Sequence, residues 1–192
     1  MVCKHRDDIP AFLNEEGLTG YGAEIGVFRG EYSEVLLKNW GGQKLYLIDV
    51  WKHLEGTVDI SNHSDEGHEE NLKETVVRIA PYKDRAEIIR GFSKDASIKF
   101  QDEYFDFVYL DAGHTYKDVV SDIKHWYPKI KINGYLMGHD YLDCTMVESN
   151  RKLLFTIFEV KSAVDGFAFL NSTKVTTVPD KFFPSWYIKK LE

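Results

Sequence analysis

The chain has 192 residues, of which 43% are hydrophobic and 14% aromatic, and this size and composition suit one domain with a single buried core. Its 24 basic and 31 acidic side chains give a formal net charge of -7, so no basic field attracts a phosphate backbone and nucleic acid is excluded as a partner. No apolar run reaches the ~18 to 20 residues that cross a bilayer, and the N-terminus lacks the apolar centre of a signal peptide. We therefore expect a cytoplasmic protein that binds no membrane.

The two cysteines are expected to be free thiols. Cys3 and Cys144 lie far apart in the sequence, and neither belongs to a Cys-x-x-Cys pair. This spacing argues against a disulfide framework and against a zinc ribbon.

The first 80 residues contain helix and strand patterns in alternation. Short, dense apolar runs indicate strands that are buried on both faces, and apolar residues three or four positions apart indicate helices. In chain order we expect a helix at 8–16, a strand that starts at 21 and ends at Glu24, a helix at 31–40, a strand at 44–51 and a helix at 65–79. Residues 1–19 would form an N-terminal cover over a core of residues 20–141.

The same alternation continues to the end of the chain. Strands are expected at 86–90, 105–110 and 135–138, helices after residue 92 and at 116–126 and 153–166, and two last strands at 175–178 and 186–190. No Asn-Gly hairpin joins adjacent apolar runs in the first 140 residues, which indicates parallel strands. We predict a single α/β domain with a Rossmann-like, mainly parallel seven-stranded sheet, helices on both faces and an antiparallel strand pair in residues 142–192. Whether residues 142–151 form a lid is left open.

Polar side chains follow every one of the five expected parallel strands. The strand ends carry Glu24 with Gly26, Asp49, Phe92 with Ser93, Asp111 with His114, and His139 with Asp140. Ligands of open parallel sheets bind outside the carboxyl ends of the strands, at the point where the strand order reverses. The sequence therefore predicts a ligand site at this edge of the sheet.

The first strand end indicates a nucleoside-like ligand without phosphates. Asp49 comes 19 residues after Gly30, close to the ~20-residue interval at which an acidic side chain meets ribose hydroxyls. Phe28 stands where a Gly-x-Gly-x-x-Gly pattern would bring the backbone against a pyrophosphate, which argues against NAD. A carboxylate at Glu24 would repel phosphate and attract an ammonium or sulfonium group.

Four segments together resemble a known family. They are Glu-Ile-Gly-Val-Phe-Arg-Gly at 24–30, Leu-Ile-Asp-Val-Trp at 47–51, Leu-Asp-Ala-Gly-His-Thr-Tyr at 110–116 and Gly-His-Asp-Tyr at 138–141. In this order they look like the motifs of class I S-adenosylmethionine-dependent methyltransferases, and most closely of the macrocin-type O-methyltransferases that act on sugars of natural products. Residues 160–165 are similar to the helix that follows strand five in that group, so the likeness spans about residues 20 to 190.

The resemblance implies which residues bind S-adenosylmethionine. Glu24, Gly26 and Ser33 would hold the methionine end, Asp49 the ribose, and Trp51, Phe92 and Ser93 the adenine. Gly30, which opens the following helix, and Asp111 are placed with these cofactor-binding residues.

The resemblance also implies a metal site. In several relatives a divalent cation beside the methyl group is held by an aspartate after strand four and two acidic residues after strand five, and Asp111 and Asp140 match two of these ligands. His139 stands where the third acidic residue is usual. Because magnesium prefers oxygen ligands, Mg²⁺, Mn²⁺, a softer ion and no ion all remain open.

Three residues are the candidates for catalysis. His139 supplies a base with a pKa near neutrality, and Asp111 could take the proton of a hydroxyl group instead. His114 either lines the pocket or caps the next helix. Thr115 is the other candidate for that cap. The expected reaction is O-methylation of a sugar or glycoside hydroxyl on a small-molecule or glycan acceptor, and assembly as a homodimer is left open.

Two other functions fit parts of the sequence. A module that binds S-adenosylmethionine without turnover would keep the same turn, although Asp111 and Asp140 argue for chemistry. An NAD-dependent oxidoreductase would use the same sheet, but Phe28 and the lack of a Tyr-x-x-x-Lys pair argue against it. His53, His63 and His68 fit no zinc motif and are expected to be exposed.

Overall fold

Seven strands form one continuous sheet. The computed structural model describes residues 3–57, 59–149, 153–180 and 183–192. The strands are β1 (Tyr21–Ile25), β2 (Lys44–Asp49), β3 (Ala86–Arg90), β4 (Phe105–Leu110), β5 (Ile130–Gly138), β8 (Thr176–Val178) and β9 (Ser185–Lys189). They lie in the order β3-β2-β1-β4-β5-β9-β8, with β1 to β5 parallel and β9 and β8 antiparallel. The predicted fold class is confirmed.

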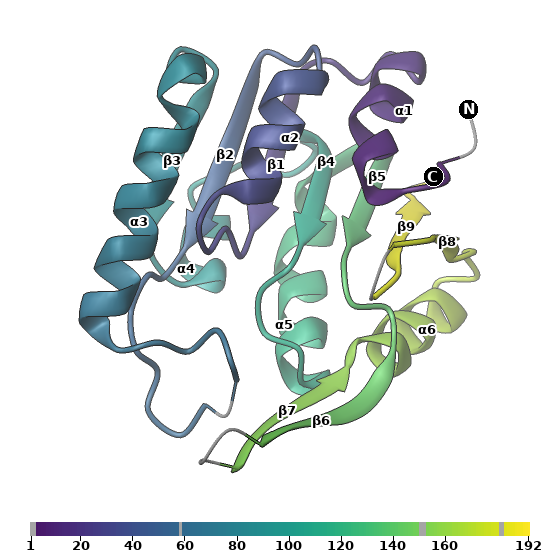
Figure 1. Ribbon diagram of the computed structural model, residues 1–192. Helices are drawn as coiled ribbons and strands as arrows, with labels where there is room; N and C mark the ends of the chain where they lie inside the picture. The colour runs from purple at the N-terminus through teal and green to yellow at the C-terminus, as the bar shows by residue number, and fades with distance from the viewer. Residues whose placement is uncertain (1–2, 58, 150–152, 181–182) are drawn as a thin grey trace.

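Helices cover both faces of this sheet (Figure 1). They are α1 (Ile9–Glu15), α2 (Glu31–Asn39), α3 (Asp65–Ile79), α4 (Ser93–Ser97), α5 (Tyr116–Trp126) and α6 (Val160–Leu170), with short 3-10 helices η1 (Arg6–Asp8), η2 (Ala80–Tyr82) and η3 (Tyr127–Lys129). Alternate residues of β2 enter two separate cores: Leu45 and Leu47 pack with α1, α2 and α3, and Tyr46 and Ile48 pack with α4, α5 and α6. This two-sided burial is why the strand reads as a continuous apolar run.

The predicted helix at 153–166 is wrong in its first half. Leu153–Glu159 forms strand β7, which pairs with β6 (Asp143–Ser149) in a separate antiparallel sheet, and α6 begins only at Val160. The sequence of β7, Leu-Leu-Phe-Thr-Ile-Phe-Glu, is rich in aromatic and β-branched residues, a composition that favours a strand over a helix. The segment considered as a lid is β6 up to Ser149, and its last residues lie outside the described part of the chain. The β6–β7 pair extends beyond the strand ends of the main sheet (Figure 1).

The strand order reverses between β1 and β4, and this creates the site. β1 pairs with β2 on one side and with β4 on the other, and the backbone N–H of Asp111 donates to the carbonyl of Ile25 at 2.7 Å. Residues far apart in sequence thus meet at the carboxyl edge of the sheet. This is the place where ligands bind in open parallel sheets, at the point where the strand order reverses.

Two further expectations concern the chain as a whole. Cys3 and Cys144 are both free thiols, as predicted. Among the described residues, no helix combines the length and the apolar character needed to cross a membrane.

Candidate active site

The turn after β1 is built around Gly26. Its φ of +88° is a left-handed conformation that favours glycine, and a Cβ there would lie 2.0 Å from the carbonyl oxygen of Asp111. The backbone of Gly26 thus lies close against the residue that follows β4, and Gly26 also borders the cavity described below. Gly30, with a φ of +73°, starts α2 as expected.

Asp49 holds this turn in shape. One carboxylate oxygen accepts hydrogen bonds from the backbone N–H groups of Val27 and Phe28, both at 2.9 Å, and the other accepts from the N–H of Trp51 at 2.8 Å. Asp49 is only half-buried and also borders the cavity, so its remaining lone pairs can still accept from a ligand.

A cavity of about 350 Å³ lies at the carboxyl ends of β1 to β4, a volume in the range of small-molecule sites. Five of the predicted cofactor residues border it, namely Gly26, Asp49, Phe92, Ser93 and Asp111. Residues that the sequence did not indicate also border it, among them Phe28, Asp59, Asn62, His68 and Asp122. The carboxyl edge of the sheet therefore holds a ligand-sized space.

Phe92 and Ser93 take different positions at this cavity. Phe92 is 53% exposed, so its ring is free to stack on a flat ligand. The hydroxyl of Ser93 donates to Asp122 at 2.5 Å and accepts from the indole N–H of Trp126 at 2.8 Å. Burial raises the pKa of the Asp122 carboxyl to about 6, against the lowering effect of the Ser93 hydrogen bond.

Trp51, predicted to contact the adenine, does not border the cavity. It is fully buried in the core on the α1, α2 and α3 side, where its indole N–H donates to the carbonyl of Phe28 at 2.8 Å. Its φ of +40° directs the chain away from the edge right after β2. Trp51 supports the turn from behind instead of lining the ligand space.

Glu24 and Ser33 form a buried pair behind the turn. Ser33 donates a short hydrogen bond to the Glu24 carboxyl, and neither residue borders the cavity. Burial raises the pKa of Glu24 to about 8, although the Ser33 hydrogen bond and the positive charge of Arg6 act in the opposite direction. Near neutral pH this carboxyl is therefore largely protonated.

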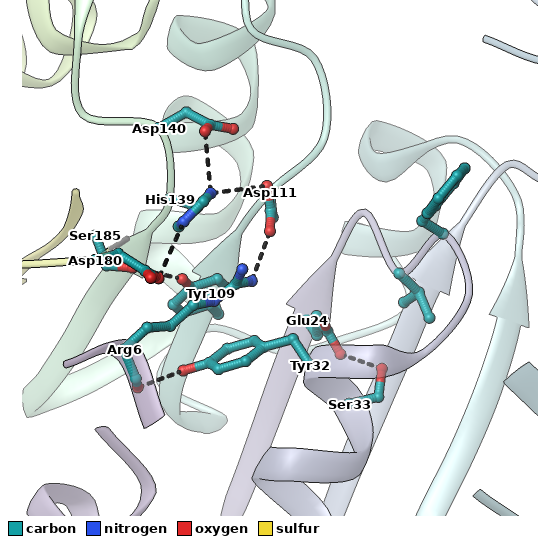
Figure 2. A network of polar contacts seen from close by, with 12 residues as sticks. Arg6, Glu24, Tyr32, Ser33, Tyr109, Asp111, His139, Asp140, Asp180 and Ser185 are labelled. Carbon is teal, nitrogen blue, oxygen red and sulfur yellow. Dashed lines mark hydrogen bonds and ion pairs between the residues drawn. The ribbon is translucent and has the colours of Figure 1, made fainter. Parts of the chain in front are cut away.

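Asp111, His139 and Asp140 come together at the ends of β4 and β5 (Figure 2). Their ligand atoms lie within 4.8 Å of one another. The Nδ1 atom of His139 is 3.0 Å from an oxygen of Asp140 and 4.0 Å from an oxygen of Asp111. Burial favours the neutral imidazole, but the carboxylates of Asp140 and Asp111 outweigh it and raise the pKa of His139.

His114 lies between two carboxylates. Its Nδ1 is 3.0 Å from Asp59 and its Nε2 is 2.9 Å from Asp140. Although burial alone would lower it, these carboxylates raise the pKa of His114 to about 10. An imidazole that stays protonated at neutral pH is a poor general base. The hydroxyl of Thr115 accepts from the N–H of Asp118, so Thr115 is the helix cap.

Arg6 and Asp180 also reach this cluster, and no sequence motif indicates either of them. The Nη2 of Arg6 donates to Asp111 at 2.7 Å, across 105 positions of sequence. Asp180 lies 3.4 Å from the Nε2 of His139 and 3.2 Å from that of His5. No local pattern links these residues, because only the folded cover and the β8–β9 connection bring them to the site.

The expectation that three histidines are exposed holds only for His53. His53 is exposed and His63 is half-buried, whereas His68 is 7% exposed and borders the cavity. His68 lies on the inward face of α3, the same face that buries Asn71 and Thr75.

The family model of a methyltransferase domain matches residues 23–141. The chain belongs to this methyltransferase domain family. The matched segment runs from within β1 to the end of the Gly-His-Asp-Tyr segment, and it contains every residue that borders the cavity. The methyltransferase part of the resemblance is therefore confirmed.

Solved structures of methyltransferases share the fold of this methyltransferase domain. A putative caffeoyl-CoA O-methyltransferase from Staphylococcus aureus matches with a TM-score of 0.67 at 15% identity, over 95% of this chain and 81% of that one. An O-methyltransferase from Bacillus cereus in complex with SAH matches with a TM-score of 0.64 at 12% identity, over 96% and 80%. An rRNA methylase from Streptococcus thermophilus matches with a TM-score of 0.60 at 11% identity, over 96% and 95%. No curated protein matches the chain.

Proposed function

We propose that the protein is an S-adenosylmethionine-dependent O-methyltransferase that acts on a hydroxyl group of a sugar or glycoside. The observation that carries the proposal is the position of the Asp111, His139 and Asp140 cluster, which adjoins a ligand-sized cavity in a methyltransferase domain. Two structural neighbours bear O-methyltransferase names, which supports transfer to oxygen. The sugar class of the acceptor rests on the macrocin-type sequence motifs.

Different residues at the cavity would bind different parts of the methyl donor. Asp49 offers free carboxylate lone pairs to the ribose hydroxyls, and the exposed ring of Phe92 offers a stacking surface to the adenine. The methionine end would lie at Gly26, with Glu24 and Ser33 behind it. A ligand ammonium group near Glu24 would lower the pKa of its carboxyl, so that Glu24 would release its proton and become ionised. Methyl transfer is an in-line displacement, so holding oxygen, carbon and sulfur in line supplies much of the acceleration.

Asp111, His139 and Asp140 have the donor atoms and the spacing for a divalent cation. Two carboxylates and one imidazole suit Mn²⁺ better than Mg²⁺, which demands oxygen ligands. A cation held by these residues would supply Lewis acidity that lowers the pKa of an acceptor hydroxyl. With no cation bound, His139 or Asp111 would accept the proton of that hydroxyl, whereas His114 is held protonated by its flanking carboxylates and instead fixes Asp140.

The donor assignment is tested by thermal shift. We expect S-adenosylhomocysteine to raise the Tm and NAD to leave it unchanged, with Mg²⁺ and Mn²⁺ added in parallel samples. Asp49→Asn should weaken the shift, because the carboxylate both shapes the turn and borders the cavity. A shift with NAD alone would point to an oxidoreductase and would refute the proposal.

The catalytic assignment is tested with the acceptor that gives turnover. Asp111→Ala and His139→Ala should each reduce kcat by about 10² or more, the usual contribution of a positioned acid or base. Binding of S-adenosylhomocysteine to the His139→Ala variant should persist, because His139 does not border the large cavity. Full turnover by both variants would show that the assignment is wrong, and donor binding with no turnover on any acceptor would indicate a binding module.

A further inference from the structure

The N-terminal segment places one cationic side chain inside the candidate active site. Arg6 begins η1, and its backbone carbonyl accepts a hydrogen bond from the hydroxyl of Tyr32 on α2 at 3.3 Å. Its guanidinium lies 3.8 Å from the centre of the Tyr32 ring and 5.2 Å from that of Tyr109 on β4. Figure 2 shows Arg6 reaching between these rings toward Asp111. Arg6 is thus held by α2 and by β4, which lie on the two sides of the point where the strand order reverses.

The guanidinium pairs with a carboxylate that a metal ion at this cluster would also need. The Nη2 of Arg6 is 2.7 Å from one oxygen of Asp111, and the other oxygen of Asp111 faces Nδ1 of His139 at 4.0 Å. A divalent cation bound between Asp111, His139 and Asp140 would lie within a few ångströms of this guanidinium. At such a separation, in a site with little water, like charges repel strongly.

The Arg6 contacts are also incomplete. Its Nε is buried and has no hydrogen-bond partner within the described part of the chain, and its side chain is 17% exposed. A buried donor that lacks an acceptor costs free energy. In this position of Arg6, at least one of the five guanidinium donors is therefore unsatisfied. The pairing with Asp111 is therefore a contact that a stronger cation can displace.

We propose that Arg6 and a divalent cation compete for Asp111, so that the N-terminal segment sets the metal affinity of the site. This inference rests on the proposed function for the cation site. With Arg6 on Asp111, the carboxylate is neutralised by the protein itself. When a cation binds, the guanidinium moves off Asp111 or loses its hydrogen bond. Arg6 is in this sense a positioning residue, because it acts through Asp111.

The test is direct binding of Mn²⁺, followed by electron paramagnetic resonance of the free ion, with S-adenosylhomocysteine present. Arg6→Met keeps a long side chain over the Tyr32 ring and removes the charge, so its Kd for Mn²⁺ should be at least tenfold lower than that of the wild type. Arg6→Lys should restore a value near the wild type. Arg78→Met is the matched control, since Arg78 pairs with Glu34 at 3.3 Å outside the site, and it should bind Mn²⁺ as the wild type does.

Two results would overturn the inference: Mn²⁺ binding by Arg6→Met that is no tighter than by the wild type, or no Mn²⁺ binding by any variant. Circular dichroism checks that Arg6→Met is folded, and if it is not, Arg6→Gln decides because it keeps donors without the charge. The proposed function fails separately, when S-adenosylhomocysteine binds to none of the proteins.

Discussion

Glu24 is a buried acid, and its surroundings determine whether its carboxyl is protonated. It is 1% exposed, and burial raises its pKa to about 8 while Ser33 and Arg6 partly offset that effect. In an unfolded chain this carboxyl would have the ordinary glutamate pKa of 4.5. The folded protein thus binds the Glu24 proton more tightly than the unfolded chain does, and this difference makes its stability depend on pH.

We predict that Glu24 makes the protein less stable as the pH rises from about 4.5 to about 8. Its contribution is fully present below the lower value and is lost as the pH passes through the higher one, a loss on the order of 4 kcal/mol by pH 8. Glu24→Gln cannot ionise, so its free energy of unfolding relative to the wild type should increase over this range. Urea denaturation at pH 5, 6, 7 and 8 measures the difference.

Glu34→Gln is the control for this experiment, because Glu34 is a half-buried carboxyl on α2 outside the turn. Its stability relative to the wild type should change little with pH. A constant gap between Glu24→Gln and the wild type at all four pH values would contradict the prediction.

Residues that directly follow a strand were the predictable part of the site. Gly26, Asp49, Asp111 and His139 were found because a parallel sheet brings all its strand ends to one edge, whatever the tertiary detail. The position of Trp51 was not predictable from the sequence. The sequence shows where β2 ends, but it does not show that Trp51 has a positive φ and that its side chain points into the core. Arg6 could not be found at all, because its partner is set by how the cover docks.

At the scale of elements, α2 is held at its C-terminal end by an arginine from another part of the chain. Arg85 donates from Nε to the carbonyl of Gly42 at 2.9 Å, and its two Nη atoms donate to the carbonyls of Leu37 and Trp40 at 3.0 and 2.5 Å. The last carbonyls of a helix lack partners within the helix and carry its negative dipole end. One cation thus satisfies three carbonyls between α2 and β2.

Arg85→Met should lower the free energy of unfolding by about 2 to 4 kcal/mol, since it removes three hydrogen bonds from a charged donor. Urea denaturation at pH 7 checks this value. Lys83→Met, which changes an exposed side chain in the same turn, should alter stability by less than about 0.5 kcal/mol. Equal stability of the two variants would show that the Arg85 hydrogen bonds contribute little.

Elements with a clear period were predicted to within a few residues, and the failures have local causes. α5 has the expected bounds and β1 ends one residue after the expected Glu24, because each pairs an unbroken pattern with a cap or turn. β5 starts at Ile130, five residues before the expected strand, because the Asn133-Gly134 pair looked like an entry turn and lies inside the strand. The sequence does not indicate the β6–β7 pair, because the apolar residues of β7 run directly into those of the helix that follows and β6 has mixed polarity.

For the whole molecule, the sheet crosses the boundary between the expected core and the C-terminal part. β9 pairs with β5 through Leu136 and Ile188, and each sheet face has its own buried cluster. The four tryptophans are fully buried and divide between the faces: Trp40 and Trp51 lie on one, Trp126 and Trp186 on the other. A single domain, predicted from the chain length, requires that both faces unfold together.

We therefore predict one cooperative transition. Double variants that keep only one tryptophan pair, Trp126→Phe with Trp186→Phe and Trp40→Phe with Trp51→Phe, report on one face each. Within each variant, urea transitions followed by fluorescence and by far-UV circular dichroism should coincide, whatever the loss of stability. A fluorescence transition that precedes the circular dichroism transition in one variant would show that the faces unfold separately.

The contact between Gly26 and the Asp111 carbonyl also limits how this sequence can diverge. A methyl group at position 26 would overlap the backbone that follows β4, whereas one at Gly91, which borders the same cavity, would meet nothing within 4 Å. In a library of random substitutions selected only for a folded product, position 91 should drift freely and position 26 should stay glycine. The two sides of the pocket therefore have unequal freedom to evolve, and new ligand specificities can be acquired more readily from the Gly91 side.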